Sequence, residues 1–264
     1  MNEFKLIEFS IDNGIASITL NRPQAGNAFN LLLATELNQA VNACQYDPNV
    51  RVVLLQAHGK LFCAGGDLAS MAEAGDQVEA ALKALTDQIH GAYSTMTRMR
   101  APVIAVINGA AAGIGMSLAL VADMTLASDK ASFLMAYTAA GLSPDGGSTY
   151  LLPKAIGIKR AKEMMITNRK LSAQEALDWG LVNQVVAHEN LQAEAQALAA
   201  TLAKGATNAF GSAKSLLLAA DTQSLEGQMA LESAAIAANA SGIDGQAGIH
   251  AFLNKQKPEF IGKS

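Results

Sequence analysis

The sequence predicts an α/β protein in which a core of strands and helices over residues 1–200 precedes a helical C-terminal region over residues 201–264. Three observations support this prediction. Short β-branched strands alternate with helical segments along the first part of the chain, whereas helical patterns dominate from Ile158 onward. Of the 264 residues, 50% are apolar and only 16% are charged, which is enough for a sizeable buried core.

The first elements are a hairpin and a helix. Phe4–Ser10 and Ile15–Leu20 flank an Asn13-Gly14 pair, and Asn-Gly between apolar runs is a strong hairpin signal. Asn30 suits the N-cap of a helix that begins at Leu31 and ends near Gln45. The same patterns predict strands at Val52–Ala57, Val103–Ile107, Met124–Ala127 and Gln184–Val186, and helices at Val78–Met99, Ile158–Thr167, Ser172–Trp179, Asn190–Ala203, Asn208–Ala220, Leu225–Asn239 and Gly242–Leu253.

Composition and charge exclude several classes of protein. A formal charge of −4 and a pI of about 5.6 argue against the clustered Lys and Arg that neutralise nucleic-acid phosphates. Cys44 and Cys63 show neither metal-ligand spacing nor a disulfide framework, as is typical of a reducing compartment. The N-terminus shows no secretory pattern, and the apolar stretch Val103–Ala122 is interrupted by Asn108 and glycines. We therefore expect a cytoplasmic protein without nucleic-acid or membrane partners.

Two loops of small residues carry the first functional signal. Residues 62–68 (FCAGGDL) follow the strand Val52–Ala57, and residues 109–115 (GAAAGIG) follow the strand Val103–Ile107. Small residues let another molecule approach the backbone, and free N–H groups at a helix start point outward. Two such loops side by side predict an oxyanion hole, although either loop taken singly is more readily explained as a tight turn. A dinucleotide fingerprint is disfavoured, because the strand after the second loop ends in Ala127-Ser128 rather than in an acidic residue.

These two loops are part of a longer series of motifs along the chain. They include ITLNRP (18–23), FCAGGDL (62–68), APVIA (101–105), ING (107–109), ADM (122–124), GLSPDGG (141–147), LSAQEA (171–176), GLVN (180–183), FLNK (252–255) and PEF (258–260). With these motifs the chain resembles the crotonase (enoyl-CoA hydratase/isomerase) superfamily over nearly its whole length. The resemblance implies a crotonase (ClpP-like) fold of repeated ββα units forming a spiral. It also implies an acyl-CoA substrate, no metal, no separate cofactor, and a homotrimer or dimer of trimers.

The resemblance also implies roles for individual residues. The N–H groups of Gly66 and Ile114 would bind the thioester oxygen, with Ile114 replacing the usual glycine. Asp67 has a second reading as the N-cap of a helix that begins at Leu68. The residues expected to contact coenzyme A are Ala64, Gly65, Asp67, Leu68, Phe252 and Lys255.

The chemistry is indicated by two replacements. Family hydratases use two glutamates, and the matching positions here are Ser117 and Tyr137, neither of which is a carboxylate base near neutral pH. One carboxylate remains, Asp145 in GLSPDGG, which resembles branches that isomerise ring-1,2-epoxyphenylacetyl-CoA or move an enoyl-CoA double bond from position 3 to position 2. An acyl-CoA isomerase with Asp145 as its acid and base is therefore expected; a turn or N-cap role is the alternative.

Other readings remain open from the sequence. His90 and Asp145 match residues of an aromatic acyl-CoA dehalogenase branch, but Tyr137 and Gly66 differ from that branch. A hydratase, another crotonase enzyme or a catalytically silent CoA-binding protein are further alternatives. A nucleic-acid-binding relative is disfavoured by the charge. Ser117, Tyr137 and His90 are expected to line the acyl pocket.

Overall fold

The computed structural model describes residues 4–262 and contains two sheets. The larger sheet is mostly parallel, and only its edge strand β1 runs antiparallel to its neighbour β2. Its strands follow one another in the order β1 (Ile7–Asp12), β2 (Ile15–Leu20), β3 (Val52–Ala57), β4 (Val103–Ile107), β6 (Met124–Ser128) and β9 (Gln184–Val186). Asn13 and Gly14 both have positive φ in the turn between β1 and β2, as a tight Asn-Gly hairpin requires.

A smaller sheet is made of three short strands that lie beside the two glycine loops. Strand β5 (Ala110–Ala112) pairs parallel with β7 (Ser132–Leu134), which pairs antiparallel with β8 (Leu171–Ser172). Because β5 begins three residues after the last residue of β4, the chain passes directly from the large sheet into the small one. This change of sheet places the second glycine loop at the carboxyl end of the central strand β4.

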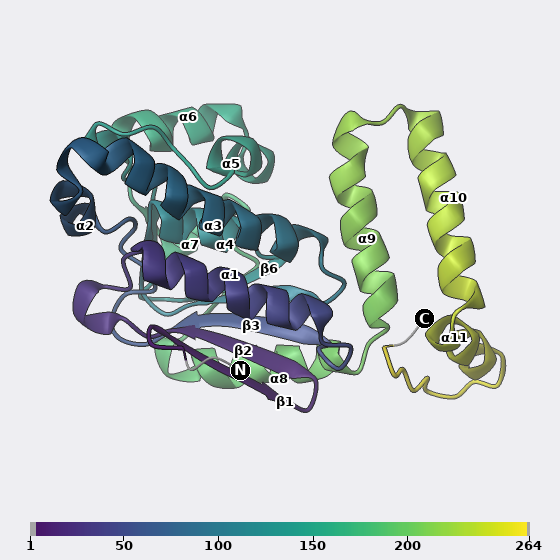
Figure 1. Cartoon of the computed structure of the whole chain (residues 1–264). Coiled ribbons are helices and arrows are strands. Elements are labelled where there is room, and N and C mark those ends of the chain that lie inside the picture. The colour runs from purple at the N-terminus through teal and green to yellow at the C-terminus, as the bar shows by residue number, and fades with distance from the viewer. Residues whose placement is uncertain (1–3, 263–264) are drawn as a thin grey trace.

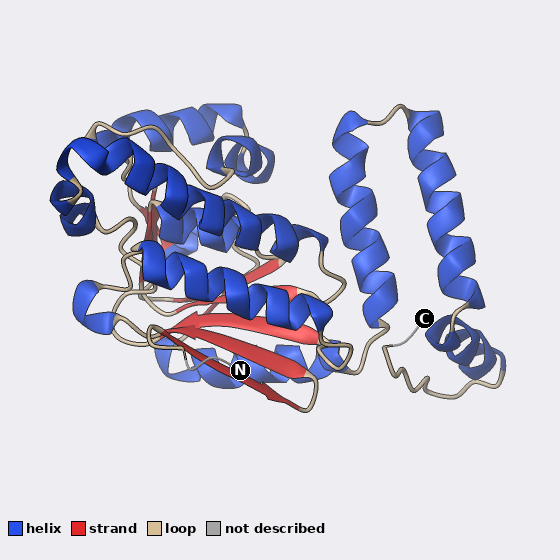
Figure 2. Cartoon of the chain, in the orientation of Figure 1, coloured by secondary structure: helices blue, strands red, loops and turns tan. Residues whose placement is uncertain are grey.

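Helices cover both faces of the large sheet (Figures 1 and 2). On one face, α1 (Leu31–Tyr46) lies against α3 (Val78–Arg98), and their apolar sides join the main core. On the other face, α8 (Leu191–Ala203) packs on the central strands through Leu191, Ala195 and Ala199. The strands between the two layers read as continuous apolar runs because both of their sides are buried.

Shorter helices complete this α/β core around the glycine loops. They are α2 (Leu68–Glu73), α4 (Ile114–Val121), α5 (Ser148–Ile156), α6 (Ile158–Thr167) and α7 (Ala173–Asp178). Asn30 accepts a hydrogen bond from Leu33 N at the start of α1, and Ser172 with Glu175 forms a capping box on α7.

The C-terminal helices stand apart from the sheet (Figure 1). Helices α9 (Thr207–Ala219) and α10 (Leu225–Ser241) form a hairpin, and α11 (Ile243–Leu253) packs against α10. Lys214 of α9 anchors the hairpin to the core, because its ammonium lies 2.6 Å from Asp123 and donates to two backbone carbonyls. The large apolar side chains left exposed on α9–α11 include Leu217, Leu225, Ile236, Phe252 and Leu253.

The predicted α/β architecture with C-terminal helices is confirmed. The strand and helix limits expected from the sequence agree with the structure to within a few residues for most elements. The short strands β5, β7 and β8 and the helix α5 were not predicted; β5 lies within residues 109–115, which were predicted to be a loop. No helix within residues 4–262 is long and apolar enough to cross a membrane.

Candidate active site

The two glycine loops lie against each other. Cys63 N donates to Ala110 O at 3.1 Å, and Ala112 N donates to Cys63 O at 2.9 Å, so the loops are joined by backbone hydrogen bonds. Gly115 makes this close approach possible, because a Cβ at that position would lie 2.5 Å from Cys63 Cβ and 2.7 Å from Cys63 O. The absence of a side chain at Gly115 therefore sets the spacing between the loops.

The first loop is held by strand-like bonds and by Asp67. Phe29 N donates to Gly65 O, and Asp67 N donates to Phe29 O, which fixes the backbone on both sides of Gly66. The Asp67 carboxylate caps α2 by accepting from Ala69 N and Ser70 N. It also forms an ion pair with Arg22 at 2.7 Å. Asp67 therefore stabilises the first loop through the cap of α2 and the ion pair with Arg22. Of the two roles considered from the sequence, a contact with coenzyme A and an N-cap, the structure shows the N-cap.

The second loop turns into helix α4 at Gly113. This residue has φ +51° and ψ −119°, a conformation that favours glycine, and it directly precedes Ile114, the first residue of the helix. The backbone N–H groups of Gly66 and Ile114 have no hydrogen-bond acceptor among residues 4–262. At Ile114 the positive end of the α4 dipole adds to this unused donor. A Cβ at Gly66 would lie 3.9 Å from Ile114 Cδ1, so the two residues that carry these donors lie close together.

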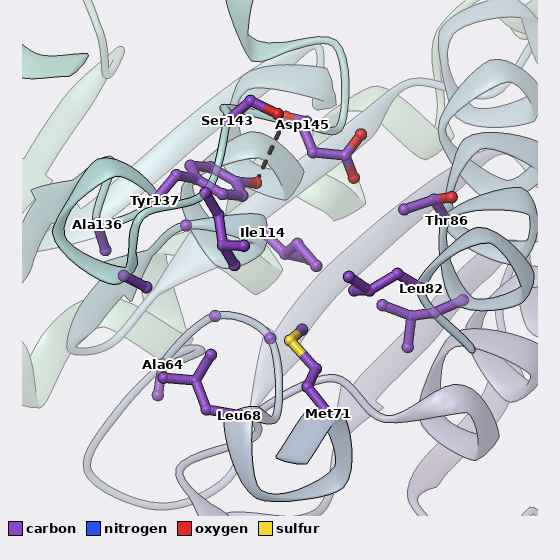
Figure 3. Close-up of a pocket in the computed structure, with 16 residues that line it drawn as sticks. Ala64, Leu68, Met71, Leu82, Thr86, Ile114, Ala136, Tyr137, Ser143 and Asp145 are labelled. Atoms are coloured by element: carbon purple, nitrogen blue, oxygen red, sulfur yellow. Dashed lines mark hydrogen bonds between the residues drawn. The ribbon is translucent and has the colours of Figure 1, made fainter. Parts of the chain in front are cut away.

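Both loops open onto a cavity of about 260 Å³, here called the main cavity (Figure 3). Most of its wall is apolar, and Asp145 is the one carboxylate among the described residues that line it. The lining residues are Ala64, Gly65, Gly66, Leu68, Met71, Leu82, Leu85, Thr86, Gly113, Ile114, Ala136, Tyr137, Ala140, Leu142, Ser143 and Asp145. An apolar cavity with one carboxylate and two unused amide donors is suited to an apolar chain that ends in a carbonyl group.

Asp145 is positioned by its backbone and by His90. Its carbonyl oxygen accepts from Ser117 Oγ at 2.9 Å and from Ser148 N at 3.3 Å, and Gly146 and Gly147 follow with positive φ. Its carboxylate Oδ1 lies 2.9 Å from His90 Nε2 of α3. The second carboxylate oxygen, Oδ2, is buried and has no hydrogen-bond partner among the described residues. The carboxylate therefore has one oxygen paired with His90 and one oxygen without a hydrogen-bond partner among the described residues.

The two positions that carry glutamates in family hydratases hold uncharged groups. Ser117 Oγ lies 3.1 Å from the Tyr137 hydroxyl. That hydroxyl also donates weakly to the Asp145 carbonyl (Figure 3). Burial raises the pKa of Tyr137 further above its ordinary value, against the lowering effect of the Ser117 hydrogen bond. Neither group supplies a base near neutral pH. They hold the Asp145 segment in place instead.

The structure brings together most of the residues singled out from the sequence. Gly66, Ile114, Tyr137 and Asp145 share the main cavity, as do three of the residues expected to contact coenzyme A: Ala64, Gly65 and Leu68. Ser117 and His90 do not line it; they lie behind Tyr137 and Asp145 and bond to them.

The other three expected coenzyme A contacts do not line the main cavity: Asp67 lies behind the first loop, and Phe252 and Lys255 lie elsewhere. Phe252 is 83% exposed on α11, and Lys255 follows the end of that helix. Helix α11 contacts α10 on the far side of the hairpin from the main cavity (Figure 1). Within one chain, therefore, neither side chain reaches the main cavity, because α9 and α10 carry α11 away from the core.

Several residues of the site were not predicted. Met71 on α2 and the α3 residues Leu82, Leu85 and Thr86 form one wall of the main cavity. Tyr93 is buried behind that wall, and its hydroxyl donates to Ile114 O at 3.0 Å, which ties α3 to the second loop. The helical spacing of Leu82, Leu85 and Thr86 shows that they share a face of α3, but the sequence does not indicate which part of that face meets the loops.

Comparisons with known proteins give the family of this chain. The family model described as enoyl-CoA hydratase/isomerase matches residues 10–263. The trans-2-decenoyl-[acyl-carrier-protein] isomerase of Streptococcus mutans is 33% identical over 99% of this chain and 100% of its own length. The 1,2-epoxyphenylacetyl-CoA isomerase of Escherichia coli is 35% identical over 96% of this chain and 97% of its own.

Solved structures show the same relationship. The crystal structure of an enoyl-CoA hydratase from Polaromonas sp. JS666 is 33% identical and superposes with a TM-score of 0.91, covering 96% of this chain and 99% of that one. The names of these relatives include both isomerases and a hydratase, so the family is shared across more than one reaction. The motifs, the paired glycine loops and these similarities together show that the chain belongs to the enoyl-CoA hydratase/isomerase family.

Proposed function

We propose that this protein is an acyl-CoA isomerase that uses Asp145 as its acid and base and the N–H groups of Gly66 and Ile114 as an oxyanion hole. One observation carries the proposal. Among the described residues that line the main cavity, Asp145 is the single carboxylate, and the cavity also exposes two unused amide donors. One base and one oxyanion hole are sufficient to move a proton along an acyl chain.

The reaction follows from these groups. The thioester oxygen accepts hydrogen bonds from Gly66 and Ile114 N–H, while Asp145 removes a proton from C2 of a 3-enoyl thioester. The electron pair of that C–H bond enters the conjugated enolate, and its negative charge is held at the oxygen. Asp145 then returns a proton to C4, which leaves the double bond between C2 and C3. No water is consumed, and each oxyanion donor contributes about 2.7–4 kcal/mol to the barrier reduction.

Hydration is disfavoured by the uncharged side chains beside Asp145. Addition of water to a double bond requires a base that activates the water and an acid that protonates the carbon. Ser117 and Tyr137 occupy the expected positions, and both bond to the backbone around Asp145. A hydratase of the two-glutamate kind is therefore not supported by these side chains.

The cavity supports a thioester with an apolar acyl group, either a 3-enoyl chain or a phenylacetate-derived ring. We propose coenzyme A as the carrier, as part of the substrate, with no metal and no redox cofactor. The Streptococcus mutans relative carries acyl carrier protein in its name, so the assay below is to be repeated with 3-enoyl thioesters of acyl carrier protein as a test of the carrier.

We further propose a cytoplasmic homotrimer or dimer of trimers. The exposed apolar residues of α9–α11 provide a surface for such an assembly. In it, Phe252 and Lys255 of one copy would approach the nucleotide end of coenzyme A bound to a neighbour.

The test is deuterium exchange followed by NMR. Saturated and 3-enoyl acyl-CoA thioesters are incubated in deuterium oxide with wild-type protein and with Asp145→Asn, and exchange at C2 and C4 is measured. We expect exchange and isomerisation with the wild type and loss of both with Asp145→Asn. Equal exchange in both proteins would remove Asp145 from the mechanism, and ordinary turnover of crotonyl-CoA to the hydrated product would favour a hydratase.

A further inference from the structure

His90 and Asp145 form a bridge between two cavities. Asp145 lies in the wall of the main cavity, whereas His90 lies in the wall of a second cavity of about 370 Å³. The second cavity lies between α3, α5 and α9, and its wall includes the exposed residues Ser94, Gly147 and Tyr150. It therefore reaches the molecular surface separately from the main cavity.

The Asp145 carboxylate has one bonded neighbour among the described residues. Its Oδ1 lies 2.9 Å from His90 Nε2, and its Oδ2 has no partner. The Asp145 side chain is 28% exposed, whereas that of His90 is 51% exposed. A proton on the carboxylate thus has a single protein group to which it can pass, and that group is much more accessible to water.

The second nitrogen of the His90 ring is available to exchange a proton with water. His90 Nδ1 has no hydrogen-bond partner among residues 4–262, while Nε2 contacts Asp145. An imidazole can accept a proton at one nitrogen and release one from the other. A ring held between a carboxylate and a water-accessible cavity has the arrangement of a proton relay.

We propose that His90 relays protons between Asp145 and solvent through the second cavity, which makes the proton returned to the substrate exchangeable with water. A proton taken from substrate carbon by Asp145 passes from the carboxyl group to the bare Nε2 of the Nδ1–H tautomer of His90, and the Nδ1 proton leaves to water, which gives the Nε2–H tautomer. In the reverse direction Nδ1 takes a proton from water, and Nε2 delivers one to Asp145. One proton enters and one leaves, so charge and atoms balance.

This inference rests on the proposed role of Asp145 and extends it. His90 does not line the main cavity, so it acts only through Asp145 and is a positioning residue that also exchanges the proton. The two tasks are separable, because a glutamine at position 90 keeps a side-chain N–H donor for Asp145 and has no second ring nitrogen. His58 offers a matched control, since its Nε2 also lies 2.8 Å from a carboxylate, that of Glu8, and it is 49% exposed.

The experiment follows the hydrogen that is returned to C4. A 3-enoyl-CoA is isomerised in deuterium oxide, and the deuterium content at C4 of the product is measured by mass spectrometry at low conversion. We expect solvent deuterium in the wild-type product. With His90→Gln we expect continued turnover but about tenfold less deuterium per turnover, a modest share of what a positioned acid or base contributes. His58→Gln should match the wild type.

A second variant guards against loss of activity in His90→Gln. His90→Ala is assayed with and without added imidazole, which fits the space beside the second cavity, and imidazole is expected to restore deuterium incorporation. Equal incorporation in wild type and His90→Gln, or no deuterium in the wild-type product, would overturn the relay. Asp145→Asn separates the two proposals, because full turnover in that variant refutes the proposed function, whereas its inactivity leaves only the relay in question.

Discussion

Replacement of Gly115 by alanine tests whether the spacing of the two glycine loops controls activity. A Cβ there would lie 2.5 Å from Cys63 Cβ, 2.7 Å from Cys63 O and 2.9 Å from Cys63 Sγ. Two of these atoms belong to the backbone or the root of a fully buried side chain, so neither can rotate away. Relief requires the loops to separate by about 1 Å, to reach ordinary contact distances near 3.5–4.0 Å.

The size of the effect follows from that displacement. Alanine gains up to about 1 kcal/mol over glycine in helix propensity, but overpacking a buried site costs about 1–3 kcal/mol, so unfolding should become slightly easier. Activity should fall much more, because a misplacement of about 1 Å at reacting groups can cost about 100-fold in rate. Both changes are measured, by chemical denaturation and by kcat for isomerisation of a 3-enoyl-CoA.

Gly248→Ala on α11 is the matched control. It also places an alanine in a helix, where the nearest atom would be Phe260 Cε1 at 3.3 Å, and it lies away from the main cavity. We expect nearly unchanged kcat in this variant. If Gly115→Ala kept its kcat although it folds, the loops would not need their observed spacing, and the oxyanion hole would have to be placed elsewhere.

Three further predictions concern stability and reactivity. Burial raises the pKa of Cys44 and of Cys63 to about 12, so neither thiol should react with Ellman's reagent at about pH 8 until the protein is denatured, when both become available. Lys214→Met should lower the free energy of unfolding by about 3–5 kcal/mol, because it leaves the Asp123 carboxylate without its cation; urea denaturation measures this. Burial acts to raise the pKa of Asp67, but hydrogen bonds from Ser70 and Arg22 outweigh it and the pKa lies below its ordinary value. The stabilisation that the ionised Asp67 carboxylate gives the folded protein is present above about pH 4 and is lost as the pH falls through its lowered pKa. The difference in the free energy of unfolding between wild type and Asp67→Asn should therefore become smaller in acid.

Local signals in the sequence were enough to predict much of the fold. Asn13-Gly14 specified a hairpin, Asn30 capped α1, and the apolar run Val103–Ile107 became the fully buried β4. Helix α5 was missed because it begins after Gly147 in the left-handed region and contains Pro153, both of which normally indicate a turn. The strand β7 was missed because three residues are too few to show a period of two.

The candidate site was predictable where it depends on backbone. The small residues around Gly66 and Gly113 had to follow two buried strands, and parallel strands place such loops at one edge of the sheet. Contacts between side chains distant in sequence were not predictable in the same way. The pairing of His90 with Asp145 joins residues 55 positions apart, and it depends on how α3 crosses the loop after Tyr137.

The position of Phe252 shows a different limit. Motif resemblance suggested a contact with coenzyme A, but resemblance does not say whether that contact is made within one chain. The hairpin of α9 and α10 carries α11 away from the main cavity, and the contacts that hold this region on the core, such as those of Lys214 and Arg51, join residues far apart in the sequence.

The central claim is that two amide donors, those of Gly66 and Ile114, polarise a thioester carbonyl in the main cavity. The most direct test is the ¹³C resonance of a non-isomerisable, saturated acyl-CoA labelled at its carbonyl carbon, recorded free and bound to Asp145→Asn, which leaves both donors in place. The account predicts a downfield shift on binding that is reduced in a protein that also carries Gly115→Ala. A bound carbonyl with the same chemical shift as the free thioester in water would contradict it.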